Sequence, residues 1–208
     1  MNSNFIHPSA IVEEGVQLGH GNYIGPGCYI KSGVVIGNNN RFEAHVMVGT
    51  APEHREFLGV SGRVVIGHHN VFREFVTIHS GTKDHTTIAD YCFLLTKSHV
   101  GHDAVLQNHV NLSCGVLVGG HSILFEGCNM GLGSVCHQFS KIGHYSMIGM
   151  NAVITKGLDV EPLGVFVGIP AERIRENTYA VQKFMITDEN MKAYAVQYYK
   201  GGSPHDHH

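Results

Sequence analysis

The chain of 208 residues is long enough for one well-cored domain, and its formal net charge of −3 argues against nucleic acid or an anionic membrane as the main partner. The first residues lack the basic and apolar regions of a secretory signal, and no apolar run is long enough to span a bilayer. The five cysteines contain no Cys-x-x-Cys pair, which favours reduced thiols in a cytoplasmic protein over a disulfide framework.

An apolar residue recurs at every sixth position over most of the chain. The period runs through residues 6–48 and 66–78 and, after a shift of frame, through residues 88–154. Neither the period of an α-helix nor that of a β-strand explains this spacing. A three-sided prism does, because each short strand contributes one inward side chain before the chain turns a corner. Three faces then make a coil of 18 residues, and successive coils stack about 4.8 Å apart.

The pattern therefore predicts a mainly β fold, a parallel β-helix of hexapeptide repeats over residues 1–170. Two segments interrupt the period, at about residues 50–63 and 79–87, and we expect them to leave the prism as loop insertions. Loops on a rigid scaffold are favoured places for substrate contacts, although a tolerated insertion would look the same. Residues 171–200 have a helical composition and predict a short helical segment at the prism end, and residues 201–208 predict a flexible His-rich tail.

Several histidines fall on neighbouring coils of the predicted prism. His102 follows the inward Val100 by two positions, and steps of 18 residues from His102 lead to Gly120 and Gln138. Three further histidines stand beside these positions or beside Val100, so all of them can share one patch. They are His99, His121 and His137.

The residue types in this patch suit general-base chemistry. The neutral imidazole of His102 can accept a proton at cytosolic pH, and the Asp103 carboxylate can orient it and stabilise the imidazolium. Neighbouring side chains of a strand point to opposite faces, so we expect their contact to need irregular backbone at Gly101. Gly120 leaves room for its backbone N–H to reach a developing oxyanion. The pattern indicates acyl transfer by direct attack, without a covalent enzyme intermediate.

Four motifs carry a specific resemblance. They are Phe-Arg-Glu-Phe-Val-Thr-Ile-His-Ser-Gly-Thr (72–82), His-Val-Gly-His-Asp (99–103), Gly-Gly-His (119–121) and His-Gln-Phe (137–139). In order and spacing, residues 6–168 resemble the UDP-N-acetylglucosamine O-acyltransferases, which are left-handed β-helix proteins of hexapeptide repeats. Those enzymes begin lipid A synthesis with an acyl carrier protein thioester as donor, and they need no cofactor or metal.

The resemblance assigns roles to the patch. It implies that His102 is the general base acting on the 3-hydroxyl of the sugar, that Asp103 supports it, and that the Gly120 N–H binds the oxyanion. It also implies a homotrimer whose sugar and acyl–pantetheine groove lies between two subunits and is lined by His99, His121, His137 and Gln138. Met150 stands where the family measures the acyl chain, so it implies a shorter chain; plain core packing would explain it equally well.

The chain also departs from the family. Where the family has an aspartate and a lysine that contact the nucleotide sugar, this sequence has His54 and Glu56. The large C-terminal helical domain of the family is reduced to about thirty residues. Its nucleotide-binding pattern of Asn and Arg survives only as a candidate match at Asn177, which we expect to bind substrate. Three basic residues are candidate phosphate contacts: Arg173, Arg175 and Lys183.

Three interpretations follow. The first is an acyl carrier protein-dependent acyltransferase acting on UDP-N-acetylglucosamine or a related UDP-amino sugar. The second is a nucleotide-sugar acetyltransferase that uses acetyl-coenzyme A, because Gly-Ile-Pro-Ala (168–171) resembles the ending of shorter acetyltransferases. The third is a metal-binding relative of the carbonic anhydrase type, or a non-catalytic relative, on the same prism.

Overall fold

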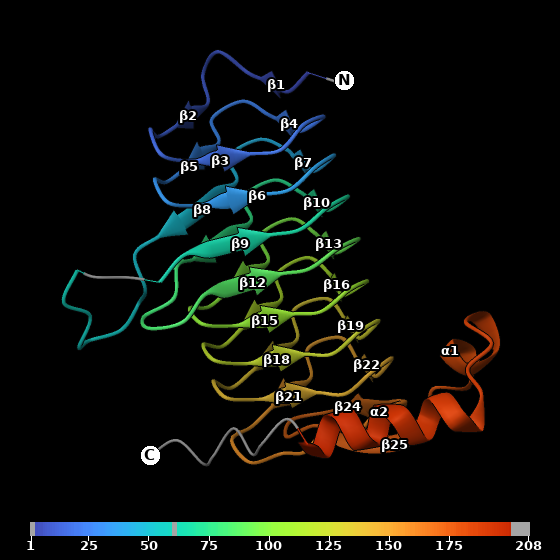
Figure 1. Cartoon of the computed structure of the whole chain (residues 1–208). Helices are drawn as coiled ribbons and strands as arrows, with labels where there is room; N and C mark the ends of the chain where they lie inside the picture. Colours follow the sequence, from blue (N-terminus) through green and yellow to red (C-terminus); the bar gives the residue numbers. More distant parts are fainter. Residues whose placement is uncertain (1–2, 60–61, 201–208) are drawn as a thin grey trace.

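The chain forms a three-sided parallel β-solenoid with a short helical segment at its C-terminal end (Figure 1). The computed structural model describes residues 3–59 and 62–200. Its strands, mostly two residues long, stack coil upon coil into three sheets, one for each face of the prism. This architecture confirms the fold predicted from the six-residue period. The predicted tail, residues 201–208, lies outside the described residues.

The three sheets follow the chain in turn, and we refer to them as the first, second and third sheet. The first contains β1 (Phe5–Ile6), β4 (Tyr23–Ile24), β7 (Arg41–Phe42), β10 (Val71–Phe72), β13 (Phe93–Leu94), β16 (Asn111–Leu112), β19 (Asn129–Met130), β22 (Met147–Ile148), β24 (Gly164–Val167) and β25 (Glu172–Glu176). The second contains β2 (Ile11–Val12), β5 (Tyr29–Ile30), β8 (Met47–Thr50), β11 (Thr77–His79), β14 (His99–Val100), β17 (Leu117–Val118), β20 (Val135–Cys136) and β23 (Val153–Ile154). The third contains β3 (Gln17–Leu18), β6 (Val35–Ile36), β9 (Val64–Ile66), β12 (Thr86–Ile88), β15 (Val105–Leu106), β18 (Ile123–Leu124) and β21 (Lys141–Ile142).

The hexad positions form the core. Val100 pairs with Val118 on the next coil, and Val118 pairs with Cys136. Each pairing joins residues 18 positions apart, so one aliphatic ladder runs down the inside of each face. The side chains at these positions are buried from Ile24 onward, whereas Ile6 at the open N-terminal end is 43% exposed. Burial of such a side chain is worth about 1.5–3 kcal/mol, and its repetition on every coil stabilises the solenoid.

Two excursions leave the prism at the same corner, where the chain passes from the second sheet to the third. The first excursion (residues 51–63, of which 60 and 61 lie outside the described residues) joins β8 to β9, and the second (residues 80–85) joins β11 to β12. Backbone hydrogen bonds tie them together: Gly62 N–H donates to Gly81 O at 2.8 Å, and Thr86 N–H donates to Arg63 O at 3.0 Å. The excursions therefore lie side by side at one corner (Figure 1).

The C-terminal segment differs from the prediction of helix throughout residues 171–200. Residues Glu172–Glu176 form β25, which pairs antiparallel with β24 on the first sheet. The chain reverses after β24, so these residues complete the sheet edge, and their exposed Glu and Arg side chains suit an edge strand. Helices follow only afterwards, as α1 (Thr178–Lys183) and α2 (Asp188–Lys200). No helix in the described ranges is long and apolar enough to cross a membrane.

Helix α2 covers the last coils through an aromatic cluster around His144. This histidine is 1% exposed, and its ring stacks on Tyr194 of α2 at 4.5 Å and packs against Phe125 at 4.8 Å between centroids. Burial disfavours the charged imidazolium and lowers the pKa of His144 from 6.5 to about 4.

The buried His144 makes the stability of the protein depend on pH. The unfolded chain takes up this proton at higher pH than the folded protein, so stability falls as the pH drops from 6.5 towards about 4. We expect His144→Phe to reduce this loss by about 1–2 kcal/mol in urea unfolding curves recorded across that range. The matched control is His69→Phe, because His69 is exposed and stacks on Tyr91. An equal pH dependence in His144→Phe and the wild type would contradict the assignment.

Candidate functional site

The candidate site lies at the corner that carries the two excursions. On the following coils, the turns after β14, β17 and β20 have the same path. Asp103, His121 and Phe139 are 18 residues apart and therefore occupy equivalent positions on three successive coils. All three adopt a left-handed backbone, with φ of 58°, 57° and 63°. Their side chains therefore stack along the corner, and the rings of His121 and Phe139 lie parallel at 4.6 Å.

His102 and Asp103 form a direct pair. The ring Nδ1 of His102 lies 2.8 Å from Oδ2 of Asp103, and the two side chains are 8% and 1% exposed. We expected irregular backbone at Gly101, but the left-handed residue is Asp103. The left-handed φ of Asp103 itself turns its carboxylate back towards the neighbouring ring. With Nδ1 bound to the carboxylate, Nε2 of His102 remains available to accept a proton.

The second excursion surrounds the Asp103 carboxylate with donors. Thr82 N–H donates to both carboxylate oxygens at 2.9 Å, and Thr82 Oγ1 donates to Oδ2 at 2.7 Å. The N–H groups of Lys83 and Asp84 donate to Oδ1 at 3.3 and 3.1 Å. Burial alone would raise the pKa of Asp103, but the hydrogen bonds from His102, Thr82 and Lys83 outweigh it and hold this pKa well below its usual range. Asp103 is therefore ionised at neutral pH.

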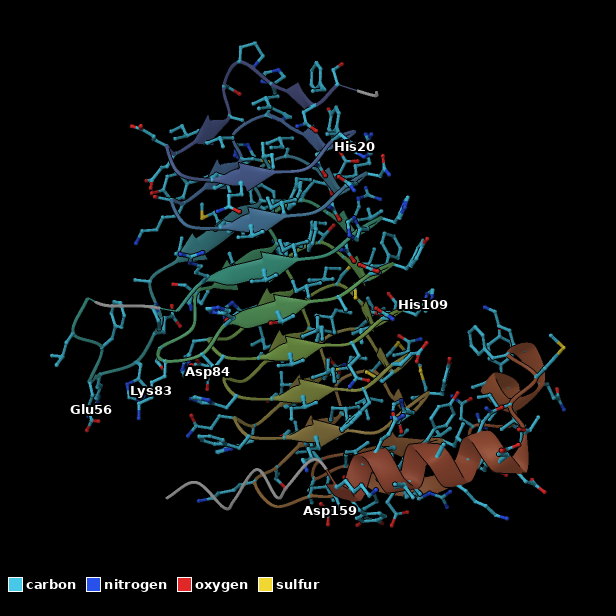
Figure 2. The ribbon with its side chains drawn as sticks, viewed as in Figure 1. His20, Glu56, Lys83, Asp84, His109 and Asp159 are labelled. Carbon is cyan, nitrogen blue, oxygen red and sulfur yellow. The ribbon has the colours of Figure 1, made fainter. Side chains whose placement is uncertain are left out.

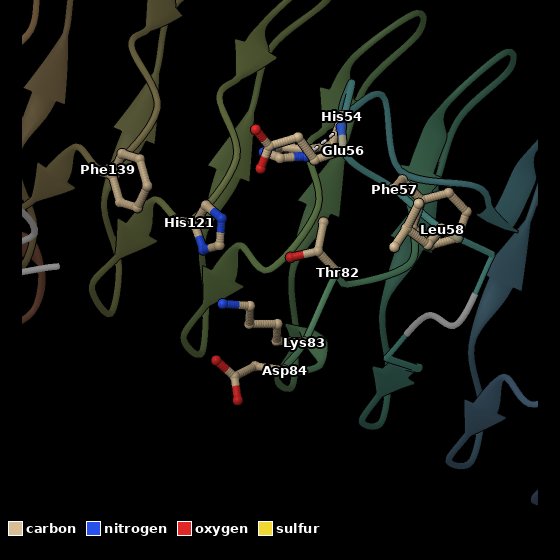
Figure 3. A pocket seen from close by; sticks show the side chains of 9 residues that line it. All are labelled: His54, Glu56, Phe57, Leu58, Thr82, Lys83, Asp84, His121 and Phe139. Carbon is tan, nitrogen blue, oxygen red and sulfur yellow. Dashed lines mark hydrogen bonds between the residues drawn. The ribbon is translucent and has the colours of Figure 1, made fainter. Parts of the chain in front are cut away.

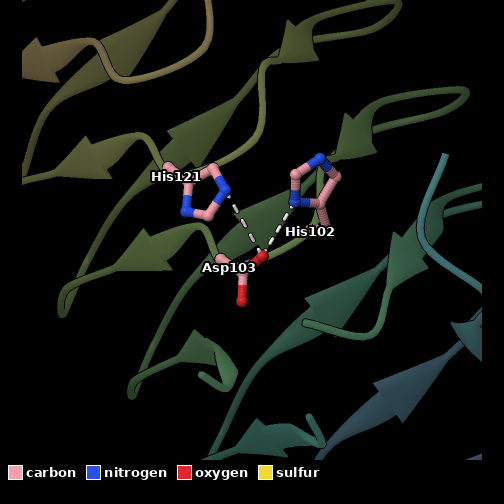
Figure 4. Close-up of side chains that lie close together, drawn as sticks. All are labelled: His102, Asp103 and His121. Carbon is pink, nitrogen blue, oxygen red and sulfur yellow. Dashed lines mark hydrogen bonds and ion pairs between the residues drawn. The ribbon is translucent and has the colours of Figure 1, made fainter. Parts of the chain in front are cut away.

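His121 completes this cluster. Its Nε2 lies 3.6 Å from the same Oδ2 of Asp103, and its ring meets that of His102 edge-on at 4.9 Å (Figure 4). Burial lowers the pKa of His121, with the Asp103 charge acting in the opposite direction. His54 of the first excursion approaches His102 from the other side, at 5.5 Å between ring centroids. The structure thus gathers three of the predicted histidines around Asp103.

Gly120 faces the His102 ring, and its lack of a side chain is required there. A Cβ on Gly120 would lie 2.7 Å from Cε1 and 2.8 Å from Nε2 of His102. Gly101 has a similar role, because a Cβ at that position would lie 2.7 Å from the backbone N of Gly120. Glycine at these two positions leaves space beside the His102 ring and beside the backbone N of Gly120, which is where an oxyanion donor is needed.

Two hollows lie close to this corner and are lined by different residues. The corner pocket, of about 590 Å³, is bounded by both excursions and by the stacked rings of the corner (Figure 3). Its lining residues are His54, Glu56, Phe57, Leu58, Thr82, Lys83, Asp84, His121 and Phe139. The face groove, of about 430 Å³, runs over the second sheet. Its lining residues are Glu53, His79, His99, Gly101, His102, Leu117, Val118, Gly119, Gly120, Val135, Cys136 and Gln138.

His79 is a site residue that the six-residue period does not single out. It is buried in the face groove, its ring meets that of His99 at 4.7 Å, and its Nδ1 has no hydrogen-bond partner among the described residues. Burial, followed by the neighbouring His79, lowers the pKa of His99 to about 4, and Thr77 Oγ1 fixes the His99 ring at 2.8 Å. The available signal was the position of His79 inside the motif at residues 72–82.

Other predicted residues lie away from His102 within the chain. His137 lines neither hollow, and its Nδ1 contacts the backbone O of Gln138 at 2.9 Å. Met150 is 68% exposed in the turn between β22 and β23, at the corner between the first and second sheets. Figure 2 shows Glu56, Lys83 and Asp84 on the two excursions and His109 on a different corner of the prism.

A third hollow, the C-terminal pocket, lies between the first sheet and the C-terminal segment and measures about 530 Å³. Arg175, Asn177 and Lys183 line it together with His109. The side chain of Asn177 caps α1, accepting from Ala180 N–H at 3.3 Å and donating to the backbone O of Tyr145 at 2.7 Å. Arg173, on the exposed strand β25, is not among the lining residues.

The cluster also has the composition of a metal site. His102, Asp103 and His121 each offer one donor atom, and these atoms lie within 4.8 Å of one another. Imidazole and carboxylate donors suit Zn²⁺. In this structure Asp103 Oδ2 already contacts both rings and also accepts the hydroxyl of Thr82. His102 and Asp103 therefore already form a hydrogen-bonded pair with the geometry of a base and its orienting carboxylate, and His121 lies beside this pair.

Comparisons with known proteins agree with the fold and the motifs. Residues 15–50 match the family described as bacterial transferase hexapeptide (six repeats). The acyl-[acyl-carrier-protein]–UDP-N-acetylglucosamine O-acyltransferase of Stutzerimonas stutzeri (strain A1501) is 34% identical over 170 residues, which cover 78% of this chain and 65% of the relative. The chain thus spans just under two thirds of the length of the curated relatives that it matches.

Solved structures extend the similarity over nearly the whole chain. The UDP-N-acetylglucosamine acyltransferase of Campylobacter jejuni superposes with a TM-score of 0.76 at 26% identity, covering 95% of this chain and 85% of the other. The enzyme of Francisella novicida gives a TM-score of 0.74 at 25% identity, covering 93% and 78%. These comparisons confirm the resemblance seen in the sequence.

Proposed function

We propose that this chain, a hexapeptide-repeat protein similar in sequence and structure to UDP-N-acetylglucosamine acyltransferases, is itself an acyltransferase. It transfers an acyl group from acyl carrier protein to the 3-position of UDP-N-acetylglucosamine or a related UDP-amino sugar, the first step of lipid A synthesis. The observation that carries this proposal is the His102–Asp103 pair, whose imidazole lies against the backbone of Gly120 in the face groove, with the corner pocket nearby.

The reaction follows from the geometry of the pair. Nε2 of His102 takes the proton of the sugar hydroxyl as its oxygen attacks the thioester carbonyl carbon. Asp103 accepts from Nδ1 and stabilises the imidazolium that forms. The Gly120 N–H binds the carbonyl oxygen as it becomes negative. The C–S bond then breaks, and the leaving thiolate takes the proton back from His102, so no covalent enzyme intermediate is needed.

The two hollows divide the substrates between them. We assign the acyl–pantetheine arm to the face groove, where the apolar Leu117 and Val135 accompany His99 and Gln138. We assign the sugar to the corner pocket, with His54, Glu56 and His121 as contacts. Lys83 lines the same pocket from the second excursion, so a lysine is present although Glu56 stands where the resemblance implies one.

In the proposed reaction, the residues that contact the nucleotide phosphates come from a second subunit. Arg175, Asn177 and Lys183 lie in the C-terminal pocket beside the first sheet, whereas His102 lies between the second and third sheets of the same chain. We propose a homotrimer in which these residues, with Arg173 and His137, approach the histidine corner of a neighbouring subunit. Cationic side chains at that position would bind the pyrophosphate.

Met150 gives a prediction on chain length. Its exposed side chain stands at the edge of the second sheet beyond β20, in the direction in which the face groove extends from His102. We expect Met150→Gly to shift the preference of the enzyme towards longer acyl donors, measured as kcat/KM over a series of acyl carrier proteins. Met185→Gly, which removes another exposed methionine, is the control. An unchanged chain-length profile would remove Met150 from the acyl site.

The donor is tested directly. The protein, freed of its His-rich tail, is given UDP-N-acetylglucosamine with either a hydroxyacyl carrier protein or acetyl-coenzyme A, and mass spectrometry follows the nucleotide sugar. Acylation from the carrier protein supports the proposal, whereas acetylation from coenzyme A alone supports the acetyltransferase interpretation. If neither donor gives product, the proposal fails for this acceptor, and metal analysis of the same preparation then tests the metal-binding interpretation.

A further inference from the structure

The hydroxyl of Thr82 lies against the carboxylate of the His102–Asp103 pair. It donates to Asp103 Oδ2 at 2.7 Å, and the same oxygen contacts His102 Nδ1 at 2.8 Å. The Thr82 N–H adds contacts at 2.9 Å to both carboxylate oxygens. Thr82 therefore binds the carboxylate through two independent groups, and only one of them depends on its side chain.

We propose that Thr82 is a positioning residue for the acyl transfer, whose hydroxyl fixes Asp103 Oδ2 against His102 Nδ1 so that Nε2 faces the acceptor. This role rests on the proposed function, and Thr82 itself contacts Asp103 and not the reacting atoms. A carboxylate oxygen held by two donors cannot rotate away from the imidazole without losing one charge-assisted hydrogen bond. The Thr82 donor also spreads the carboxylate charge, which weakens the pull of Asp103 on a proton at His102.

The second excursion is built to hold Thr82 in place. A Cβ on Gly81 would lie 2.1 Å from Asp84 O and 2.6 Å from Asp103 Oδ1, so only glycine permits this approach. Ser80 N–H donates to Thr50 O at 2.9 Å, which anchors the start of the excursion to the end of β8. At its end, the hydroxyl of the buried Thr86 accepts from Asp103 N–H at 2.8 Å. The excursion and the carboxylate thus form one connected unit.

Several other titratable groups face this pair, and a test must leave them unchanged. His121 approaches Asp103 from the next coil, and His54 approaches His102 from the first excursion. In the face groove His102 is accompanied by three further titratable residues: Glu53, His79 and His99. Lys83 and Asp84 point into the corner pocket from the second excursion (Figure 3). Substitution of the Thr82 hydroxyl alone alters none of these charges.

The test compares Thr82→Val, which removes the hydroxyl at nearly constant shape, with Thr82→Ser, which keeps it. In Thr82→Val we expect kcat to fall about tenfold with KM for the sugar unchanged, because one charge-assisted hydrogen bond is lost. The freed carboxylate holds a proton on His102 more firmly, so the acid limb of the kcat/KM profile moves to higher pH. The His102 ring resonance in NMR, assigned by comparison with His102→Gln, titrates at correspondingly higher pH. Thr82→Ser restores both readouts.

Thr87→Val is the matched control, because Thr87 lies near the same excursion and, among the described residues, its hydroxyl donates only to the backbone O of His85, at 3.5 Å. Unchanged kcat and His102 titration in Thr82→Val would overturn the proposal, as would equal impairment of Thr82→Ser and Thr82→Val. The NMR titration does not depend on turnover. If the wild-type protein forms no product, the proposed function fails, while the titration still decides the role of Thr82.

Discussion

Replacement of His102 by alanine is expected to lower kcat by about three orders of magnitude or more while the solenoid stays folded. General-base assistance contributes roughly 10²–10⁴ to such reactions, and no other ring is bound to Asp103 through so short a contact. His121 lies 3.6 Å from Asp103 and lines the corner pocket, whereas His102 and Gly120 line the face groove. Steady-state kinetics with acyl carrier protein donors measure the effect.

The control for this variant is His20→Ala, since His20 is exposed on an N-terminal coil far along the chain from the site. Thermal unfolding and gel filtration of both variants separate loss of chemistry from loss of structure. A His102→Ala protein that keeps more than about a tenth of wild-type turnover would rule out His102 as the base.

The second large effect is expected at Gly120. In Gly120→Ala the new methyl group would lie 2.7–2.8 Å from the His102 ring, so the ring must move away from the oxyanion position. We expect kcat to fall about a hundredfold, the scale on which loss of an oxyanion donor acts. Because the His102 ring lines the face groove and is not a member of the hydrophobic core, the unfolding temperature should change less than kcat.

Gly157→Ala controls for the loss of a glycine. Gly157 has a φ of 79°, and nothing lies within 4 Å of the place that a methyl group would take, so alanine there strains only the backbone. That variant should lose some stability and keep wild-type kcat. If Gly120→Ala were as active as Gly157→Ala, the close approach of Gly120 to His102 would have no part in catalysis.

The fold was predictable because the apolar residues at every sixth position are the ones whose side chains point into the prism. From Ile24 onward the hexad residues, such as Val100 and Leu112, are buried, and neither a helix nor an ordinary strand places one inward residue at that interval. The same period places His102, Gly120 and Gln138 on neighbouring coils from their spacing alone. Their roles came from the resemblance, because spacing does not distinguish a base from a surface histidine.

The features that were missed depend on contacts outside the period. The path of the second excursion brings Thr82 to Asp103, 21 residues away in the sequence. Most of the contacts come from backbone N–H groups, which every residue except proline has, so the sequence does not reveal them. The left-handed turn at Asp103 was also hidden, since aspartate accepts that conformation without requiring it. Strand β25 lies in a segment of helical composition. It forms because it pairs with β24, and local composition does not reveal such a tertiary contact.

The most direct test of the central claim is a single-turnover experiment with excess enzyme, one hydroxyacyl carrier protein and UDP-N-acetylglucosamine. Mass spectrometry of rapidly quenched samples follows the nucleotide sugar and the intact protein together, for the wild type and His102→Ala. We expect acylated nucleotide sugar from the wild type alone and no acylated enzyme at any time. Acyl groups that accumulate on the protein, or wild-type samples without acylated sugar, would contradict direct transfer by the His102–Asp103 pair.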